Sequence, residues 1–213
     1  MYHDFIAKLQ EEINKGLPGW DAQKKLAPPN RPKEQFIAAT ENTPRESGVL
    51  VWLYPKGNTI YTRLILRVEG RVHSGQVAFP GGKKEETDKS FWNTALREAQ
   101  EEVGLPTEQI KLVGALTPLY IPPSNFWVNP FIGTSDTYMP ATINKTEVQA
   151  CFDVDIIQLL QPKTKTEGPI TLSSGEQRIT PFYTLEGHTV WGATAMILSE
   201  LEELIRRTGF TSF

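Results

Sequence analysis

The sequence predicts an α/β protein, a sandwich of helices on a mixed β-sheet. Two observations support this prediction. Strand-like segments make up most of the chain, and two amphipathic helices stand among them, one at residues 90–103 and one around residues 196–207. The length of 213 residues agrees with one core domain that carries elaborations, because a domain typically takes about 100–200 residues.

The chain begins with an amphipathic segment. Apolar residues recur at helical spacing from Phe5 to Ile13, and the pattern stops at Gly16. Many prolines follow, which indicates a connector. We therefore expect residues 1–46 to form an N-terminal helix and a proline-rich connector packed on the core, and residues 47–213 to form the main domain.

The sheet is predicted from short apolar and β-branched runs that are bounded by turn residues. Val49–Leu53 and Ile60–Leu66 flank a turn-rich stretch, so we expect them to form a hairpin. A glycine-containing loop at residues 67–82 follows the hairpin. Further strands are expected beyond the middle helix, at Ile110–Leu116, Val128–Ile132, Glu147–Val154, Ile170–Leu172, Arg178–Phe182 and Val190–Trp191.

Both predicted helices have recognisable ends. Ser90 is the expected N-cap of the middle helix, and Gly104 stops it. The last helix carries Arg206 and Arg207 in its final turn, where the helix dipole favours positive charge, and Gly209 lies just beyond. These signals fix the middle helix, which also carries the most informative side chains.

One face of the middle helix carries three carboxylates. Glu98, Glu101 and Glu102 stand at positions i, i+3 and i+4, so they project from the same side, while apolar residues gather on another side. A solvated acidic face is one interpretation of this pattern. The other is a metal site, because hard divalent cations prefer carboxylate oxygens. The glycine pair that ends at Gly82 favours the metal site, since it lets a backbone carbonyl approach.

The composition narrows the class of protein. A formal charge of −3 and a pI near 5.7 argue against a protein that coats nucleic acid. No apolar run approaches the roughly 18 residues that span a bilayer, and the N-terminus lacks a signal-peptide pattern, so we expect a cytoplasmic protein with no membrane partner. The single cysteine, Cys151, excludes an intrachain disulfide, and we expect it to be buried.

The residues around the acidic face resemble the signature of the Nudix hydrolase family. That signature is Gly, five residues, Glu, seven residues, then Arg-Glu-aliphatic-x-Glu-Glu-x-Gly-aliphatic, and the chain has Gly82 followed by Arg97-Glu98-Ala99-Gln100-Glu101-Glu102-Val103-Gly104-Leu105. The chain departs from the signature at Asp88, which replaces the first glutamate, and in having eight residues between Asp88 and Arg97. The resemblance implies an α/β/α sandwich, a Mg²⁺ or Mn²⁺ cofactor and hydrolysis of a diphosphate linkage in a nucleotide derivative.

A longer part of the chain is similar to the coenzyme A pyrophosphatase subfamily. The pattern Arg71-x-x-x-Gly75-x-x-x-Phe79-Pro80-Gly81-Gly82 precedes the acidic helix, and residues 17–19 and 191–195 are similar as well. This resemblance implies cleavage of coenzyme A or its thioesters to adenosine 3′,5′-bisphosphate and a 4′-phosphopantetheine. The alternative substrates are ADP-ribose, a dinucleotide such as NADH, or a nucleoside triphosphate. An alternative from another class is a sensor that binds a nucleotide without hydrolysing it.

The same resemblance suggests roles for the acidic residues. Glu98 and Glu102 are expected to bind the metal, with Glu101 as a further ligand or a neighbour, and with the backbone of Gly82 beside them. Arg97 is expected to pair with a glutamate and to hold its side chain in place. A bound cation would then lie between these carboxylates and the phosphates of the substrate.

The general base and the substrate contacts are less closely defined. Glu147 is our candidate for the base, the alternative being a solvated residue at the start of a strand. Arg71 and Arg67 are candidates for binding substrate phosphates, with surface salt bridges as the alternative, and Gln76 is a candidate for orienting a substrate group. Residues 118–127 form a lid over the substrate or pack their aromatic side chains in the core. The expected partner is a small nucleotide, and a homodimer is left open.

Overall fold

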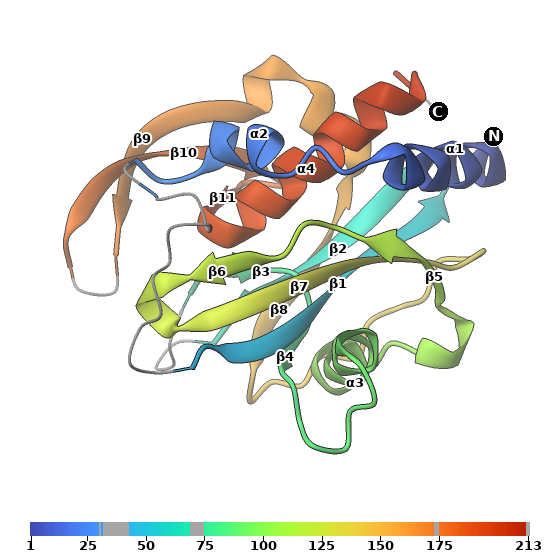
Figure 1. Ribbon diagram of the computed structural model, residues 1–213, viewed down its shortest axis with the longest axis horizontal. Helices are drawn as coiled ribbons and strands as arrows, with labels where there is room; N and C mark the ends of the chain where they lie inside the picture. The colour runs from blue at the N-terminus through green and yellow to red at the C-terminus, as the bar shows by residue number, and fades with distance from the viewer. Residues whose placement is uncertain (30, 32–42, 69–74, 173–174, 212–213) are drawn as a thin grey trace.

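The computed structural model describes residues 1–29, 31, 43–68, 75–172 and 175–211 (Figure 1). Its centre is a large sheet that is formed by β1 (Arg45–Lys56), β2 (Thr59–Arg67), β3 (Val77–Ala78), β4 (Gly81–Lys83), β5 (Lys111–Ala115), β6 (Leu119–Ile121), β7 (Phe126–Thr134) and β8 (Val148–Asp155). The order is β3-β2-β1-β7-β5, while β8 pairs with β2, β4 with β1 and β6 with β7. Because β1 and β7 run parallel and the other pairs are antiparallel, the predicted mixed sheet is confirmed.

Helices cover both faces of this sheet (Figure 1). One face carries α3 (Phe91–Val103), and the other carries α1 (Tyr2–Lys15), α2 (Trp20–Gln23) and α4 (Gly192–Thr208). The alternation of side chains along β1 explains the two layers, because successive residues of a strand point to opposite faces. Leu50, Trp52 and Tyr54 pack beneath α3, whereas Val51 and Leu53 pack beneath α4. The fold is therefore an α/β/α sandwich.

The strongest local signals in the sequence are confirmed. β1 and β2 form the expected hairpin, in which Pro55 lies opposite Ile60 and Gly57 adopts a φ of 63° in the turn. α3 begins after Ser90, whose side chain accepts a hydrogen bond from the Asn93 N–H, and it ends at Gly104. The loop expected at residues 67–82 contains the short strands β3 and β4, and its residues 69–74 lie outside the described part of the chain.

The N-terminal segment packs on the last helix. Phe5 and Leu9 of α1 are fully buried in the core that α4 completes. Within α4, the buried Glu200 accepts hydrogen bonds from the Gly19 N–H and from Gln23 Nε2. The start of the connector, whose order its prolines left open, contains the short helix α2. The division of the chain at residues 46 and 47 stays a prediction.

Two further regions differ from the expectation or extend it. Residues 119–121, within the candidate lid, are strand β6, which pairs in register with β7 so that Tyr120 lies opposite Trp127. Phe126 packs against the core, whereas Trp127 is only partly buried and lines a surface pocket with Lys83 and Glu85, so the lid over the substrate stays a prediction. A second, antiparallel sheet contains β9 (Lys165–Thr171), β10 (Gln177–Leu185) and β11 (His188–Trp191). It includes the three strands that were predicted there.

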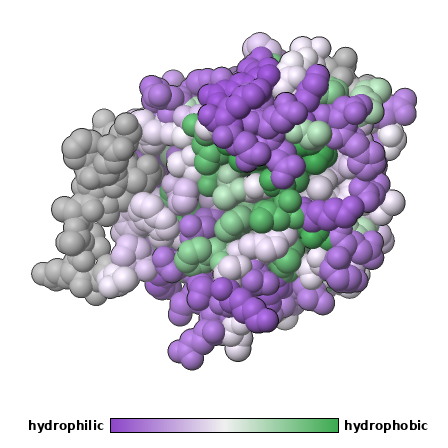
Figure 2. All heavy atoms as spheres, turned by 45° about the vertical axis from the view of Figure 1, so that its right-hand side comes forward, coloured by the Kyte–Doolittle hydropathy of each residue, from purple (hydrophilic) through white to green (hydrophobic). Residues whose placement is uncertain are grey.

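The surface is largely polar on the face that Figure 2 displays, with hydrophobic side chains gathered in a strip between polar ones. Within the described part of the chain, no helix is long and apolar enough to cross a membrane. Cys151, which was expected to be buried, is a free thiol that is only partly buried on β8.

Candidate active site

The helix α3 lies directly on the central strand β1, and a glycine makes this approach possible. A Cβ atom at Gly48 would come within 2.2 Å of the Phe91 carbonyl oxygen. Ala95 and Ala99, on the side of α3 that faces the sheet, have no exposed surface. The small residues therefore bring the helix close to the sheet, and the acidic residues of α3 then face β4. Nothing in the sequence pattern singled out Gly48.

The glycine pair of β4 lies against two of the acidic residues. A Cβ atom at Gly82 would come within 2.4 Å of Glu98 Cδ, so the carboxylate of Glu98 fills the space that a side chain would take. The Gly81 N–H donates a hydrogen bond of 2.9 Å to Glu102 Oε2. Both glycines are held in place by pairing with β1, where Gly82 lies opposite Gly48. The structure thus brings Glu98, Glu102 and Gly82 together.

Burial shapes the electrostatics of these carboxylates. Glu102 has no exposed surface, and this burial raises the pKa of Glu102 to about 7, although the guanidinium of Arg67 opposes the rise. Burial also raises the pKa of Glu98, against the effect of Arg97. The charge of Glu147 adds to the rise at both residues, so Glu147 lies within electrostatic reach of the pair. A buried group of like charges is stable only when something positive offsets it.

The end of α3 positions Glu147. The N–H groups of Thr142 and Asn144 donate to the carbonyls of Val103 and Glu102, so the loop before β8 satisfies the last turn of the helix. The Val68 N–H donates to the Glu147 carbonyl at 3.1 Å, which ties this loop to the end of β2. These bonds hold the backbone around Glu147 between the end of α3 and the end of β2.

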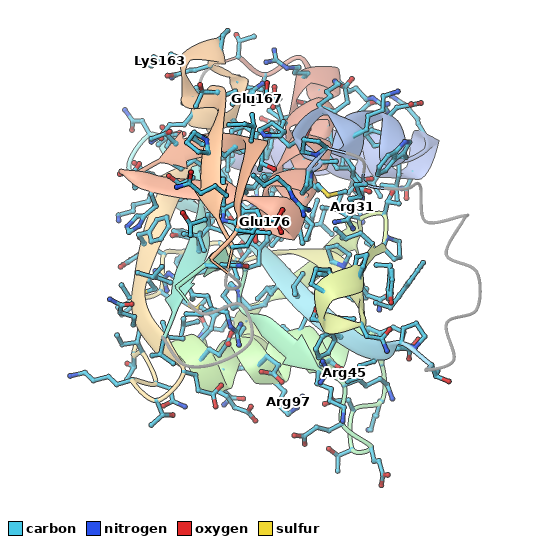
Figure 3. All side chains as sticks on the ribbon, turned by 90° about the vertical axis from the view of Figure 1, so that its left-hand side faces the viewer. Arg31, Arg45, Arg97, Lys163, Glu167 and Glu176 are labelled. Carbon is cyan, nitrogen blue, oxygen red and sulfur yellow. The ribbon has the colours of Figure 1, made fainter. Side chains whose placement is uncertain are left out.

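Arg97 pairs with glutamates, as the sequence suggested, and it also pairs with Asp88. Its Nη1 donates to Glu98 Oε1 and to Glu101 Oε2, both at 3.0 Å. Its other nitrogens bind Asp88 in a bidentate pair at 3.1 and 3.0 Å. These bonds hold the pKa of Asp88 at about 2, well below its usual value. Arg97 lies on the α3 side of the molecule, opposite Lys163 and Glu167 (Figure 3).

Asp88 was recognised in the sequence only as a departure from the signature. Its carboxylate also accepts hydrogen bonds from the Glu85 N–H and from Thr94 Oγ1, so the shorter side chain is held by its own loop and by the first turns of α3. The insertion of one residue before Arg97 accompanies this arrangement. Glu101, in contrast, is more than half exposed, and it accepts a hydrogen bond from Arg97.

The candidate substrate residues lie at the end of β2 and beyond it. Arg67 Nη1 is 3.2 Å from Glu102 Oε1, so this arginine reaches the acidic site itself. Gln76 is partly buried beside it, and its carbonyl accepts a hydrogen bond from the Arg67 N–H. Arg71 lies outside the described residues. The roles of these three residues in binding substrate stay predictions.

The residues at this site fit a divalent cation. Glu102 Oε1 is buried and accepts no hydrogen bond of good geometry from the described residues, and Glu98 lies over a glycine that leaves its carboxylate room. Within the described ranges, no group of three or more acidic, histidine or cysteine side chains is arranged to hold a metal ion by itself. Such a group is not required, because Mg²⁺ is usually held by one or two carboxylates together with substrate phosphates.

An α/β/α sandwich that presents the buried Glu102 and the partly buried Glu98 beside a glycine pair fits a hydrolase that binds a divalent cation. The NUDIX domain family model matches residues 44–172, and the chain belongs to the Nudix hydrolase family. It is 34% identical to the uncharacterized Nudix hydrolase NudL of Photorhabdus laumondii over 152 residues, 71% of this chain and 79% of the relative. NudL of Salmonella newport is 34% identical over 159 residues, 74% and 81% of the two chains.

A solved structure shares the fold. The MutT protein from Methanosarcina mazei Go1 aligns with a TM-score of 0.50 and 17% identity, covering 78% of this chain and 96% of that chain. At this identity the likeness concerns the fold alone. The family membership supplies the coarser function: the protein is a pyrophosphohydrolase of nucleotide derivatives, in a family that generally uses divalent metal ions.

Proposed function

We propose that the protein hydrolyses the diphosphate linkage of coenzyme A or acyl-coenzyme A to adenosine 3′,5′-bisphosphate and (acyl-)4′-phosphopantetheine. The contacts of two glutamates with the glycine pair support the reaction most directly. Glu98 lies against Gly82, and Glu102 accepts a hydrogen bond from the Gly81 N–H. The substrate is supported by the subfamily pattern from Arg71 to Gly82 and by the similar residues at 17–19 and 191–195.

The residues divide the work as follows. Glu98 and Glu102 would hold Mg²⁺ or Mn²⁺ with the Gly82 backbone, and the cation would offset phosphate charge and polarise phosphorus. Arg97 keeps the Glu98 carboxylate in one orientation through its bond at 3.0 Å. Glu147 would accept a proton from the attacking water, because its charge lies close enough to raise the pKa of both Glu98 and Glu102.

The main alternative keeps the reaction and changes the substrate to ADP-ribose, NADH or another nucleoside diphosphate derivative. The same site would serve any of these substrates, since the carboxylates would act on the diphosphate and not on the groups attached to it. A nucleotide sensor without hydrolysis is a weaker alternative, because Arg97, Glu98, Glu101 and Glu102 are all present. A cytoplasmic location is part of the proposal, and a homodimer is left open.

A side-by-side product assay tests the substrate. Coenzyme A, acetyl-coenzyme A, ADP-ribose and NADH are offered at equal concentration with Mg²⁺ or Mn²⁺, and kcat/KM is measured for each. We expect coenzyme A or its thioester to be cleaved at least about tenfold more efficiently than the others, which corresponds to about 1.4 kcal/mol in transition-state stabilisation. Preference for ADP-ribose or NADH would retain the hydrolase and reject coenzyme A. Binding without any product would favour the sensor.

A further inference from the structure

The backbone of Arg67 is fixed at the point where β2 ends. Its N–H donates to the Gln76 carbonyl and its carbonyl accepts from the Gly75 N–H, both at 3.2 Å. The pairing of β2 with β8 also shifts register between Leu66 and Arg67. Bulges of this kind turn a side chain out of the regular alternation and occur next to active sites. Arg67 is thus aimed into the acidic site from a rigid position.

Arg67 lies close to Glu102, but the two side chains do not form a hydrogen bond of good geometry. Its Nη1 lies 3.2 Å from Glu102 Oε1 and donates a long bond of 3.5 Å to the Gly81 carbonyl. Glu102 Oε1 nevertheless has no hydrogen bond of good geometry from the described residues, whereas Oε2 has the Gly81 N–H. Arg67 therefore neutralises Glu102 mainly by charge. Because no well-formed hydrogen bond has to break, Glu102 Oε1 can exchange Arg67 for another positive partner.

A metal ion and Arg67 would both interact with Glu102 Oε1. Glu102 has no exposed surface, so its carboxylate needs a positive partner, and Arg67 is the one that contacts it within the described chain. An oxygen that binds Mg²⁺ lies about 2.0–2.1 Å from the ion. The guanidinium of Arg67 lies 3.2 Å from Glu102 Oε1, so a cation bound to that oxygen would repel the positive charge of Arg67. Glu102 can thus have the cation or Arg67 as its close partner, but not both.

We propose that Arg67 couples metal binding to substrate binding. It pairs with Glu102 until the carboxylate binds a cation, and it then turns to the diphosphate oxygens of the substrate. The guanidinium is suited to the second role by its planar fork, and about a quarter of the side chain is already exposed. The inference rests on the proposed metal-dependent hydrolysis, but its test requires neither coenzyme A nor turnover, so the two can fail separately.

The first test measures the affinity for Mn²⁺ alone, by calorimetry, in the absence of any nucleotide. Arg67→Gln removes the competing cation, so we expect it to bind Mn²⁺ about fivefold or more tightly than the parent protein. Arg67→Lys keeps the charge and is expected to bind Mn²⁺ as the parent does. Arg178→Gln is the matched control, because it removes one positive charge from an exposed pair with Glu176 and should change nothing. Equal affinity of Arg67→Gln and the parent would overturn the proposal.

The second test changes Glu102 instead of Arg67 and measures the binding of a phosphate compound instead of a metal. It remains informative if Arg67→Gln folds poorly. Glu102→Gln keeps the shape of the side chain and frees Arg67 from its charged partner. In EDTA, we expect it to bind inorganic pyrophosphate about fivefold or more tightly than the parent, and the double variant with Arg67→Gln to lose this gain. Glu98→Gln removes one negative charge that does not pair with Arg67, and it should gain less. A gain that survives in the double variant, or no gain in Glu102→Gln, would contradict the coupling.

Discussion

The carboxylate of Glu98 occupies the space in which Gly82 would carry a side chain, with Glu98 Cδ 2.4 Å from the position of an ideal Cβ. This relationship explains why a glycine stands sixteen positions before Glu98. Because glycine has no side chain, the carboxylate of Glu98 can lie directly against the backbone of Gly82. The position of Glu98 is therefore defined by two elements, α3 and β4.

Gly82→Ala is expected to move Glu98 and so to impair catalysis. A displacement on the order of 1 Å can cost about a hundredfold in rate, and we expect a fall in kcat of that size with the fold retained. Steady-state kinetics and circular dichroism measure the two effects. Gly168→Ala serves as the control, because its Cβ would meet only the Phe182 ring at 3.4 Å. Equal kcat for Gly82→Ala and the parent would contradict this account of the site.

Glu98→Gln and Glu102→Gln are each expected to lower kcat by about a hundredfold or more, since a neutral amide is a poor ligand for a hard cation. Neither should unfold the protein, because the amide keeps the shape of the side chain, and the Gly81 N–H retains an oxygen acceptor at residue 102. Thermal unfolding checks this second point. Glu108→Gln, on an exposed residue just beyond α3, should retain full activity. Substantial turnover by either site variant would reject the metal assignment.

Asp88→Asn is expected to lower the free energy of unfolding by about 1–3 kcal/mol, since it breaks the charged bidentate pair with Arg97. The folded-state pKa of Asp88, about 2, lies below its ordinary value of 3.8, so this stabilisation is present above pH 4 and is lost as the pH falls towards 2. Urea unfolding of both proteins across this range should show their difference shrinking. A difference that does not depend on pH would show that the pair contributes little.

Glu200→Ala should detach the N-terminal segment from α4. Gly19, Gln23 and Thr117 would lose a common acceptor, and buried donors left unpaired cost about 1–3 kcal/mol each. We expect a loss of about 3 kcal/mol or more in the free energy of unfolding, with faster hydrogen exchange in α1. Glu203→Ala, on the same helix but in a surface pair with Lys25, should cost about 1 kcal/mol or less. Similar losses in the two variants would argue against this role of Glu200.

The parts of the fold that were predicted correctly are those with strong local signals. Ser90 and Gly104 mark the ends of α3 through hydrogen bonds and backbone angles that depend on neighbouring residues only. β6 was missed because Leu119–Ile121 is short and lies among prolines, and it becomes a strand only by pairing with β7. The helix α2 was missed for a similar reason, since its four residues are held by α4.

The site was predictable where side chains share one helix. The spacing of Glu98, Glu101 and Glu102 placed them on one face, and the structure adds that Glu102 is buried whereas Glu101 is largely exposed. The approach of α3 to Gly48 and the contact of Arg67 with Glu102 join segments far apart in the sequence. Helical spacing carries no information about such contacts, so they required the three-dimensional structure.

The most direct test of the central claim is the identity and metal dependence of the product. Coenzyme A is incubated with the parent protein and with Glu98→Gln, in Mg²⁺, in Mn²⁺ and in EDTA, and adenosine 3′,5′-bisphosphate is measured. We predict this product from the parent protein with either cation, little from Glu98→Gln, and none in EDTA. Product that forms equally in EDTA, or equally with Glu98→Gln, would contradict a metal-dependent reaction at this acidic site.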